Sequence, residues 1–157
     1  MPGSFIDTNV LVYVASDDPV KADRAERIIA DGGTISVQVL NELANVARRK
    51  MRMTWPETHG LLSMIRALLS VRPITAETHD TELALAERYG LSIYDATIAA
   101  SALHAECDTL WSEDTHDGVV IQDWLRIADP FPPGDDHSSA GWAPLKPPFR
   151  TERPRSA

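Results

Sequence analysis

Cysteine is almost absent from this chain of 157 residues, which holds Cys107 alone. One cysteine excludes an intramolecular disulfide and fits the reducing cytoplasm, where we expect the protein to reside. Long hydrophobic runs are missing from the N-terminal region too, since the longest there, residues 10–15, is far too short to span a membrane. No lysine or arginine precedes Lys21, so the basic region of a signal peptide is also missing.

Positive charge is the next scarce feature, with 15 lysines and arginines against 23 aspartates and glutamates and a net charge of −8. Taken alone, this balance argues against a nucleic-acid binder, which usually carries a basic patch. The distribution weakens that argument, because four basic residues gather in RRKMR, residues 48–52. Several acids also stand in apolar surroundings, where a bound divalent cation would offset part of the negative charge.

Short strands are expected to alternate with helices along one domain, residues 1–131. The expected strands cover residues 4–7, 34–37, 71–75, 108–112 and 125–129. The expected helices cover residues 8–13, 19–31, 38–51, 55–70, 77–90 and 93–106, and Thr8 or Asn9 is expected to cap the first of them. This alternation predicts an α/β fold with a parallel sheet that helices cover on both faces.

The C-terminal region differs in composition from the rest of the chain. Seven of the eleven prolines lie from Pro130 onward, and no helical or strand period is present there. We therefore expect residues 132–157 to form a Pro-rich tail that is flexible or draped over the body.

Three acids stand where a buried chain is expected. Asp7 ends the first strand, where an aspartate can serve either as a cap of the next helix or as a functional residue, because the carboxyl ends of parallel strands form the ligand crevice of such sheets. Glu42 lies beside the apolar stripe of its helix, where a partly packed boundary glutamate is the simpler interpretation. Asp95 precedes the small-residue run IAASA, and a charged aspartate on that packed side is costly unless it is paired or binds a metal. Asp95 could alternatively interact with the helix dipole as an acid of the first turn.

An acidic loop follows the strand that ends near Ser112, and it contains Glu113, Asp114 and Asp117. Such a loop is usually a solvated turn. In a right-handed α/β sheet, however, Asp7, Glu42, Asp95 and Asp114 all belong to the same edge. Converging carboxylates repel one another unless a cation lies between them, and all-oxygen ligands select Mg²⁺ or Mn²⁺. Such a crevice suits phosphodiester chemistry, in which Asn9 and Ser112 could orient ligands or waters.

Four segments of the sequence together resemble the PIN-domain ribonucleases. They are FIDTNVLVY with Asp7, SVQVLNEL with Glu42, LSIYDATIAASA with Asp95, and LWSEDTHDG with Asp114. Their order and spacing match over about residues 4–131, and more narrowly they resemble the VapC-type toxins of bacterial toxin–antitoxin pairs. Each segment alone is a weak signal, and the tail departs from the family pattern.

The resemblance implies a three-layer α/β/α fold with a central, mostly parallel sheet, and Mg²⁺- or Mn²⁺-dependent endonucleolytic cleavage of RNA. It also implies a homodimer and an antitoxin partner that blocks the acidic crevice. By matching positions, the catalytic and metal-binding acids are Asp7, Glu42, Asp95 and Asp114, while Thr8, Asn9 and Ser112 match the supporting polar positions less firmly. Asp117 could add a ligand or a water contact, and the choice between Asp114 and Asp117 as fourth acid stays open.

Two other functions deserve comparison. A catalytically weak or inactive PIN-like module that binds a protein partner would form complexes without Mg²⁺-dependent cleavage. A metal-dependent phosphatase of small esters is disfavoured, because Asn9 stands two residues after Asp7 where a second acid would be expected. The basic run of residues 48–52 fits either favourable charge at a helix C-terminus or contact with the phosphates of RNA.

Overall fold

The computed structural model describes residues 3–113 and 117–131. The expected tail, residues 132–157, and the expected fourth acid, Asp114, therefore lie outside the described residues. None of the helices in the described part is both long enough and apolar enough to cross a membrane.

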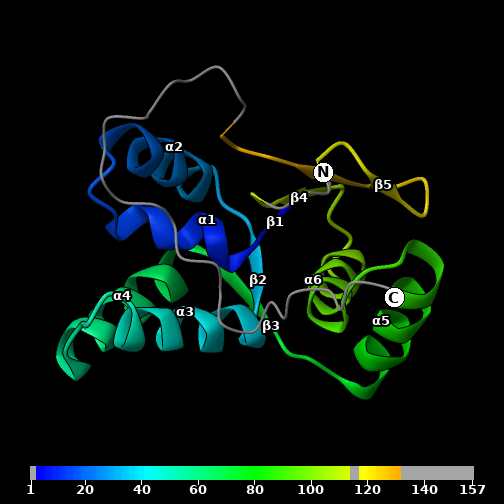
Figure 1. The fold of residues 1–157 in the computed structure, drawn as a ribbon, viewed down its shortest axis with the longest axis horizontal. Helices are drawn as coiled ribbons and strands as arrows, with labels where there is room; N and C mark the ends of the chain where they lie inside the picture. Colours follow the sequence, from blue (N-terminus) through cyan, green and yellow to red (C-terminus); the bar gives the residue numbers. More distant parts are fainter. Residues whose placement is uncertain (1–2, 114–116, 132–157) are drawn as a thin grey trace, which may run out of the picture.

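Within the described residues, six strands form one sheet in the order β3-β2-β1-β4-β6-β5 (Figure 1). β3, β2, β1, β4 and β6 pair in parallel in this order, and β5 pairs with β6 in the antiparallel direction. The mostly parallel sheet predicted from the sequence is confirmed. The strands are β1 (Ser4–Ile6), β2 (Thr34–Ser36), β3 (Ser70–Arg72), β4 (Thr109–Trp111), β5 (Val120–Ile121) and β6 (Leu125–Ala128).

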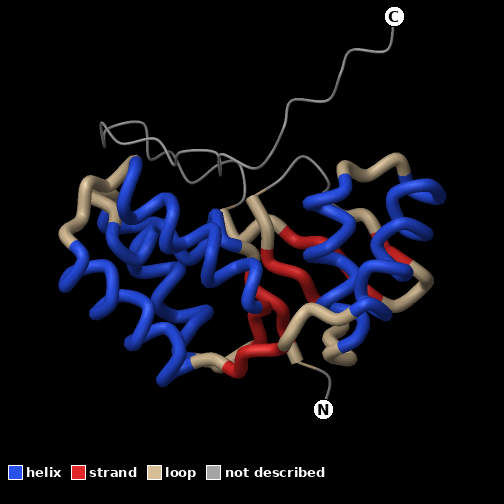
Figure 2. Tube along the Cα trace, turned by 90° about the horizontal axis from the view of Figure 1, so that it is seen from below, coloured by secondary structure: helices blue, strands red, loops and turns tan. Residues whose placement is uncertain are grey.

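Helices cover both faces of the sheet and complete a three-layer α/β/α fold (Figure 2). One side carries α1 (Thr8–Val12), the short 3-10 helix η1 (Tyr13–Ala15), α2 (Pro19–Ala30), α3 (Val37–Arg49) and α4 (Trp55–Leu68). The other side carries α5 (Ala76–Tyr89) and α6 (Ile93–His104), which pack closely against each other. The expected layering is confirmed.

The helix starts follow from capping side chains that the sequence supplies just before four of the helices. The hydroxyl groups of Ser36, Thr54, Thr75 and Ser92 each accept a backbone N–H from the first turn of the helix that follows. At the other end of α5, Gly90 has a φ of 66°, a conformation that glycine adopts without strain. These local signals set the points where the helices begin and end, and Glu42 and Asp95 lie in two helices that start with such a cap.

β1, β4 and β6 are each shorter than predicted by one or two end residues, and three further differences have a clear physical reason. β2 ends at Ser36 because α3 already begins at Val37. β3 spans residues 70–72 and not 71–75, since Pro73 has no N–H to continue the ladder. β5 was not predicted at all, because two residues carry no detectable alternation of apolar and polar side chains.

The core lies between the sheet and its two helical layers. Phe5 and Ile6 of β1 are fully buried, and so is Tyr13. Small residues of α6, including Ala96, Ala99 and Ala102, allow this helix to approach the sheet closely. The edge of the sheet where β1 and β4 end therefore adjoins a closely packed core.

Candidate active site

Asp7 follows β1 directly and stands just before α1. Its Oδ1 accepts the backbone N–H of Thr8 at 2.7 Å, so Asp7 is the N-cap residue of α1. The expectation that Thr8 or Asn9 caps this helix is wrong, because both residues already lie inside it. The Asp7 side chain is 2% exposed, and a carboxylate buried to this degree needs hydrogen-bond donors or a cation around it.

Ser112 provides a second donor to Asp7 from the neighbouring strand. The backbone N–H of Asp7 bonds the carbonyl of Trp111, and this pairing of β1 with β4 brings Ser112 beside the Asp7 carboxylate. The Ser112 hydroxyl donates to Asp7 Oδ2 at 2.8 Å and accepts from Asn9 Nδ2 at 3.4 Å. Asn9 also accepts the backbone N–H of Glu113 through its Oδ1 at 3.2 Å. These contacts hold the carboxylate of Asp7 in one orientation.

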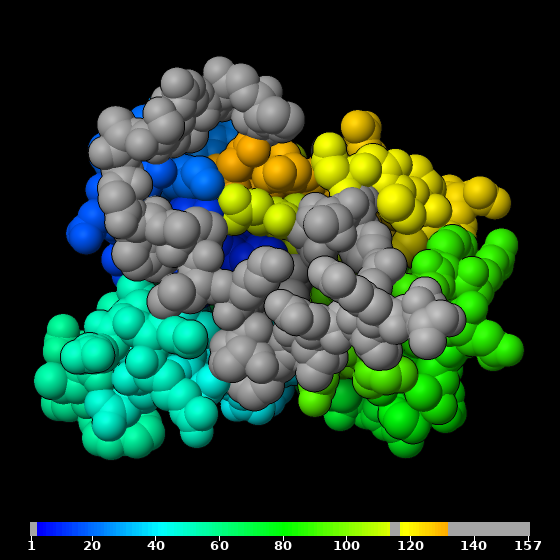
Figure 3. All heavy atoms as spheres, viewed as in Figure 1, coloured from blue at the N-terminus to red at the C-terminus, as the bar shows by residue number. Residues whose placement is uncertain are grey.

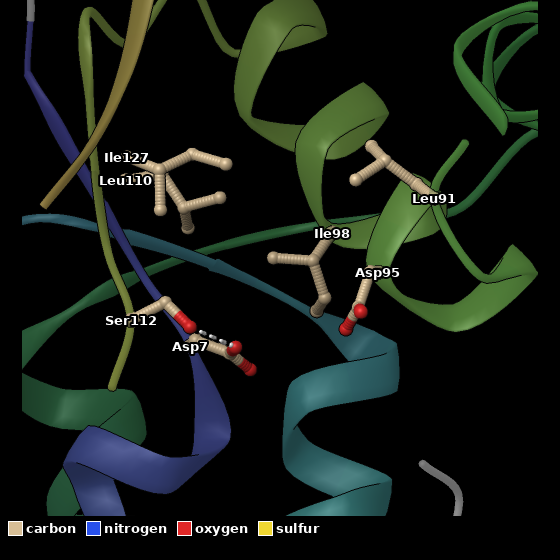
Figure 4. Close-up of a pocket in the computed structure, with 7 residues that line it drawn as sticks. All are labelled: Asp7, Leu91, Asp95, Ile98, Leu110, Ser112 and Ile127. Carbon is tan, nitrogen blue, oxygen red and sulfur yellow. Dashed lines mark hydrogen bonds between the residues drawn. The ribbon is translucent and has the colours of Figure 1, made fainter. Parts of the chain in front are cut away.

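Asp95 reaches the same place from the opposite helical layer. It lies in the first turn of α6, where its backbone N–H bonds the capping hydroxyl of Ser92 at 3.1 Å. The carboxylates of Asp7 and Asp95 point toward one another across a small pocket whose other lining includes Ser112 (Figure 4). The rest of the pocket is apolar, formed by Leu91, Ile98, Leu110 and Ile127. The structure thus brings two of the predicted acids together in low-polarity surroundings.

Glu42 is joined to this site through Thr8 and does not line the pocket itself. It is 5% exposed, so it is a buried residue and not the partly solvated boundary glutamate that its position in the helix favoured. Its Oε2 accepts the Thr8 hydroxyl at 2.6 Å, and its Oε1 accepts Gln38 Nε2 at 3.0 Å. Thr8 also donates its backbone N–H to Asp7, so the carboxylates of Asp7 and Glu42 belong to one hydrogen-bonded network.

The acidic loop is described on either side of residues 114–116. Asp117 is exposed, and its Oδ1 accepts the backbone N–H of Asp129 at 2.9 Å. Glu113 forms an ion pair with Lys21 at 3.2 Å, and Lys21 also donates to the Tyr13 hydroxyl. Burial raises the pKa of Asp129 above its usual value, and the negative charges of Glu113 and Asp117 act in the same direction.

The pocket's donors fit a hard divalent cation. Two carboxylates that face each other among apolar side chains repel, and a cation between them would remove that repulsion. The volume, about 10 Å³, leaves room for one water-sized particle. In residues 3–113 and 117–131, no three acidic, histidine or cysteine side chains form a metal-binding cluster. The fit is therefore to an ion such as Mg²⁺, which often takes one or two carboxylates and completes its shell with waters and substrate oxygens.

Sequence reasoning missed two supporting residues of the site. Gln38 stands four positions before Glu42 on α3, and this spacing places both side chains on one face of a helix. That signal was present in the sequence. Lys21 gave no comparable signal, because its contacts with Tyr13 and Glu113 depend on how α2 packs against η1 and the end of β4.

The comparisons with known proteins agree with this architecture. A family model described as the PIN domain matches residues 4–117. No protein of curated function matches the chain by sequence. A toxin–antitoxin complex from Klebsiella pneumoniae contains a similar fold, with a TM-score of 0.63 and 20% identity over 82% of this chain and 98% of that one.

Two further solved structures share the fold. One is the Mycobacterium tuberculosis toxin VapC20, described as cleaving the sarcin–ricin loop, with a TM-score of 0.58 and 19% identity over 92% of this chain and 99% of that one. The other is VapBC2 from Rickettsia felis, bound to a DNA fragment from its promoter. It has a TM-score of 0.59 and 22% identity over 80% of this chain and 97% of that one.

Proposed function

The chain belongs to the PIN domain family, and from this premise we propose that it is a metal-dependent endoribonuclease. We propose further that it acts as the toxin of a toxin–antitoxin pair. One observation carries the catalytic part: Asp7 and Asp95, from opposite helical layers, face one pocket at the end of β1 and β4. The description of VapC20 as a toxin that cleaves the sarcin–ricin loop supports RNA as the substrate.

The proposed catalytic acids are Asp7, Glu42 and Asp95, with Asp114 as the fourth. Asp7 is fixed by the Thr8 N–H and the Ser112 hydroxyl, and Glu42 by the Thr8 hydroxyl and the Gln38 amide. These donors hold each carboxylate in one orientation. Positioned oxygens of this kind are what a metal-dependent nuclease requires of its protein.

Asp7 and Asp95 would hold the divalent ion, Mg²⁺ or Mn²⁺, and Glu42 and Asp114 are the further acids of the proposed site. When bound, the ion supplies positive charge that polarises the phosphate and acidifies the attacking water. A carboxylate of the site that does not hold the ion can accept the proton that this water loses. The apolar side chains beside Asp7 and Asp95, such as Leu91 and Ile98, lower the local polarity and so strengthen each electrostatic contact.

Partners follow from the chain's charge and from its structural neighbours. The Klebsiella structure is a toxin–antitoxin complex and the Rickettsia structure is VapBC2, and this supports an antitoxin as partner. A homodimer is proposed as the assembly because the resemblance to VapC-type toxins implies it. For a chain with net charge −8, RNA contact requires local positive charge. The proposed phosphate contacts are three exposed residues at and just after the end of α3: Arg49, Lys50 and Arg52. Arg48 instead donates to the Met53 carbonyl and stacks on Trp55.

Cleavage of mixed cellular RNA tests the proposal. Purified protein is incubated with the RNA with and without Mg²⁺, and the new ends are mapped. Wild-type protein should cut at defined sites when Mg²⁺ is present, and Asp95→Asn should abolish the cuts while leaving the unfolding curve unchanged. Glu77→Gln is the matched control, because it neutralises an exposed first-turn acid on the neighbouring helix α5. Cutting by Asp95→Asn at the parent rate would refute the assignment.

A second candidate is a PIN-like module that works by binding a protein and cleaves weakly or not at all. One observation favours it: in the described part of the chain, no three potential metal ligands lie together. This function predicts a stable complex with the antitoxin and no Mg²⁺-dependent cuts in the same RNA experiment. If titration calorimetry detects no heat of Mg²⁺ or Mn²⁺ binding, the protein-binding module is favoured over the nuclease.

A further inference from the structure

A second, larger groove lies next to the acidic pocket. It has a volume of about 670 Å³ and is lined from three parts of the chain: the start of α3, the connection after β3 and the first turn of α6. Figure 3 shows the α3–α4 side in cyan and the α5–α6 side in green on opposite flanks of one face. The lining of the groove includes Val37, Gln38, Asn41, Glu42, Ile74 and Tyr94.

The groove is continuous with the proposed catalytic residues. Glu42 is part of its wall and is bonded through Thr8 to the chain at Asp7. On the other side, Tyr94 lines the groove and directly precedes Asp95 in α6. A strand of RNA whose phosphate lies at the carboxylates must continue to either side of them. The groove is therefore within reach of a nucleotide that neighbours the bond to be cut.

The lining matches the chemistry of an unpaired base. Val37, Ile74 and Tyr94 are 43%, 40% and 41% exposed, so apolar surface and an aromatic ring are accessible there. The amides of Gln38 and Asn41 stand among them, and an amide has two donors and one acceptor. Gln38 uses one donor on Glu42, which leaves capacity for other contacts. Proteins recognise single-stranded RNA with this combination of a stacking ring and groups that read base edges.

We propose that this groove binds one unpaired base of the substrate RNA beside the scissile phosphate. Tyr94 stacks on the base, and Asn41 with Gln38 contacts its edge. The inference rests on the proposed nuclease function, because that function places RNA at the adjoining carboxylates. A peptide segment of a partner protein is the competing occupant. The base is favoured since the groove adjoins the place where a phosphate would bind and carries amides next to its aromatic ring.

The test measures binding separately from cleavage. The full-length protein is titrated, with Ca²⁺ in place of Mg²⁺, into labelled single-stranded homopolymer RNAs, one for each base. A second probe is an oligonucleotide of equal length with the same sugar–phosphate backbone and no bases. Fluorescence anisotropy gives the dissociation constant for each probe, and a gel confirms that each RNA stays intact. The variants are Tyr94→Ala, Tyr94→Phe and Asn41→Ala, and Ile93→Ala is the control because it removes an exposed apolar side chain of the same helix turn.

Tyr94→Ala should weaken binding of the preferred homopolymer by roughly 5- to 100-fold, as expected when one stacked base loses its platform. Binding of the base-free backbone should not change, because it has nothing to stack. Tyr94→Phe should retain the affinity, Asn41→Ala should reduce the preference among the four bases, and Ile93→Ala should match wild type. These results together would establish a base-binding groove.

Three outcomes separate the inference from the function on which it rests. Equal weakening of both probes, or of neither, by Tyr94→Ala overturns the base-binding groove even if the RNA is cut. A loss confined to self-association, followed by light scattering on the same samples, also overturns it and assigns the groove to a protein interface. Base-dependent binding without any Mg²⁺-dependent cleavage by wild-type protein supports the groove and refutes the nuclease.

Discussion

The Thr8 hydroxyl donates a 2.6 Å hydrogen bond to Oε2 of Glu42, a residue 34 positions later in the chain. Both residues are buried, and the bond connects the first turn of α1 to the middle of α3. Thr8 also donates its backbone N–H to Asp7. One residue therefore fixes two of the proposed catalytic carboxylates at the same time, through two different atoms.

Replacement of Thr8 by valine should destabilise the protein by about 1–3 kcal/mol at neutral pH, since Glu42 would lose a buried donor. Thr8→Ser keeps the hydroxyl and should recover most of that loss. Urea unfolding measures both changes, and an unaltered slope with denaturant would show that the folded and unfolded states kept their compactness. Equal stability of Thr8→Val and wild type would mean that the bond contributes no net stability.

Removal of the Ser112 hydroxyl should weaken metal binding more than it weakens the fold. Ser112→Ala deletes the donor to Asp7 Oδ2, and loss of such an orienting partner commonly lowers metal affinity by about 10- to 100-fold. Isothermal titration with Mn²⁺ measures this change. Ser101→Ala is the matched control, because the hydroxyl of this buried serine has no hydrogen-bond partner in the described part of the chain. Equal metal affinity of Ser112→Ala and Ser101→Ala would contradict the orienting role.

Stability in alkali should depend on Tyr13. Burial, together with a hydrogen bond to Glu113, raises the pKa of the Tyr13 phenol far above its usual value of 10.0. Above about pH 10 the unfolded chain loses this proton while the folded chain keeps it, so stability falls as pH rises. One group contributes a slope of at most about 1.4 kcal/mol per pH unit. Chemical denaturation between pH 9 and 11 should give a shallower fall for Tyr13→Phe than for wild type, and equal slopes would exclude Tyr13 as the cause.

The sequence predicted the order of elements well because its junctions carry strong local signals. Pro19 begins α2 and Gly90 ends α5, and both follow from backbone geometry that few other residues share. The prediction failed where pairing between strands decided the outcome. β5 exists because Val120 and Ile121 pair with β6, and two residues carry too little pattern to reveal a partner elsewhere in the chain.

The proposed site shows the same division. Asp7 and Asp95 were singled out because a carboxylate in an apolar segment is costly, and the structure places both at one pocket. Glu42 was less clear, since its helical position fitted a solvated boundary residue as well as a buried one. Its burial became evident from the contacts with Thr8 and Gln38. The place of Asp114 lies outside the described residues, so its role stays a prediction.

The amino-acid sequence by itself determined most of the segments that become helices and strands, with β5 as the exception, and which acids stand at their ends. Capping, proline and glycine geometry and apolar periodicity act over a few neighbouring residues, so a short stretch of sequence carries them. Tertiary structure alone decided that Asp7 and Asp95 share a pocket, that Glu42 is bonded to Thr8, and that Tyr94 borders a groove beside them. Those contacts join residues far apart in the chain. They form when the sheet and its two helical layers bury a common core, a process whose outcome no short stretch of sequence encodes.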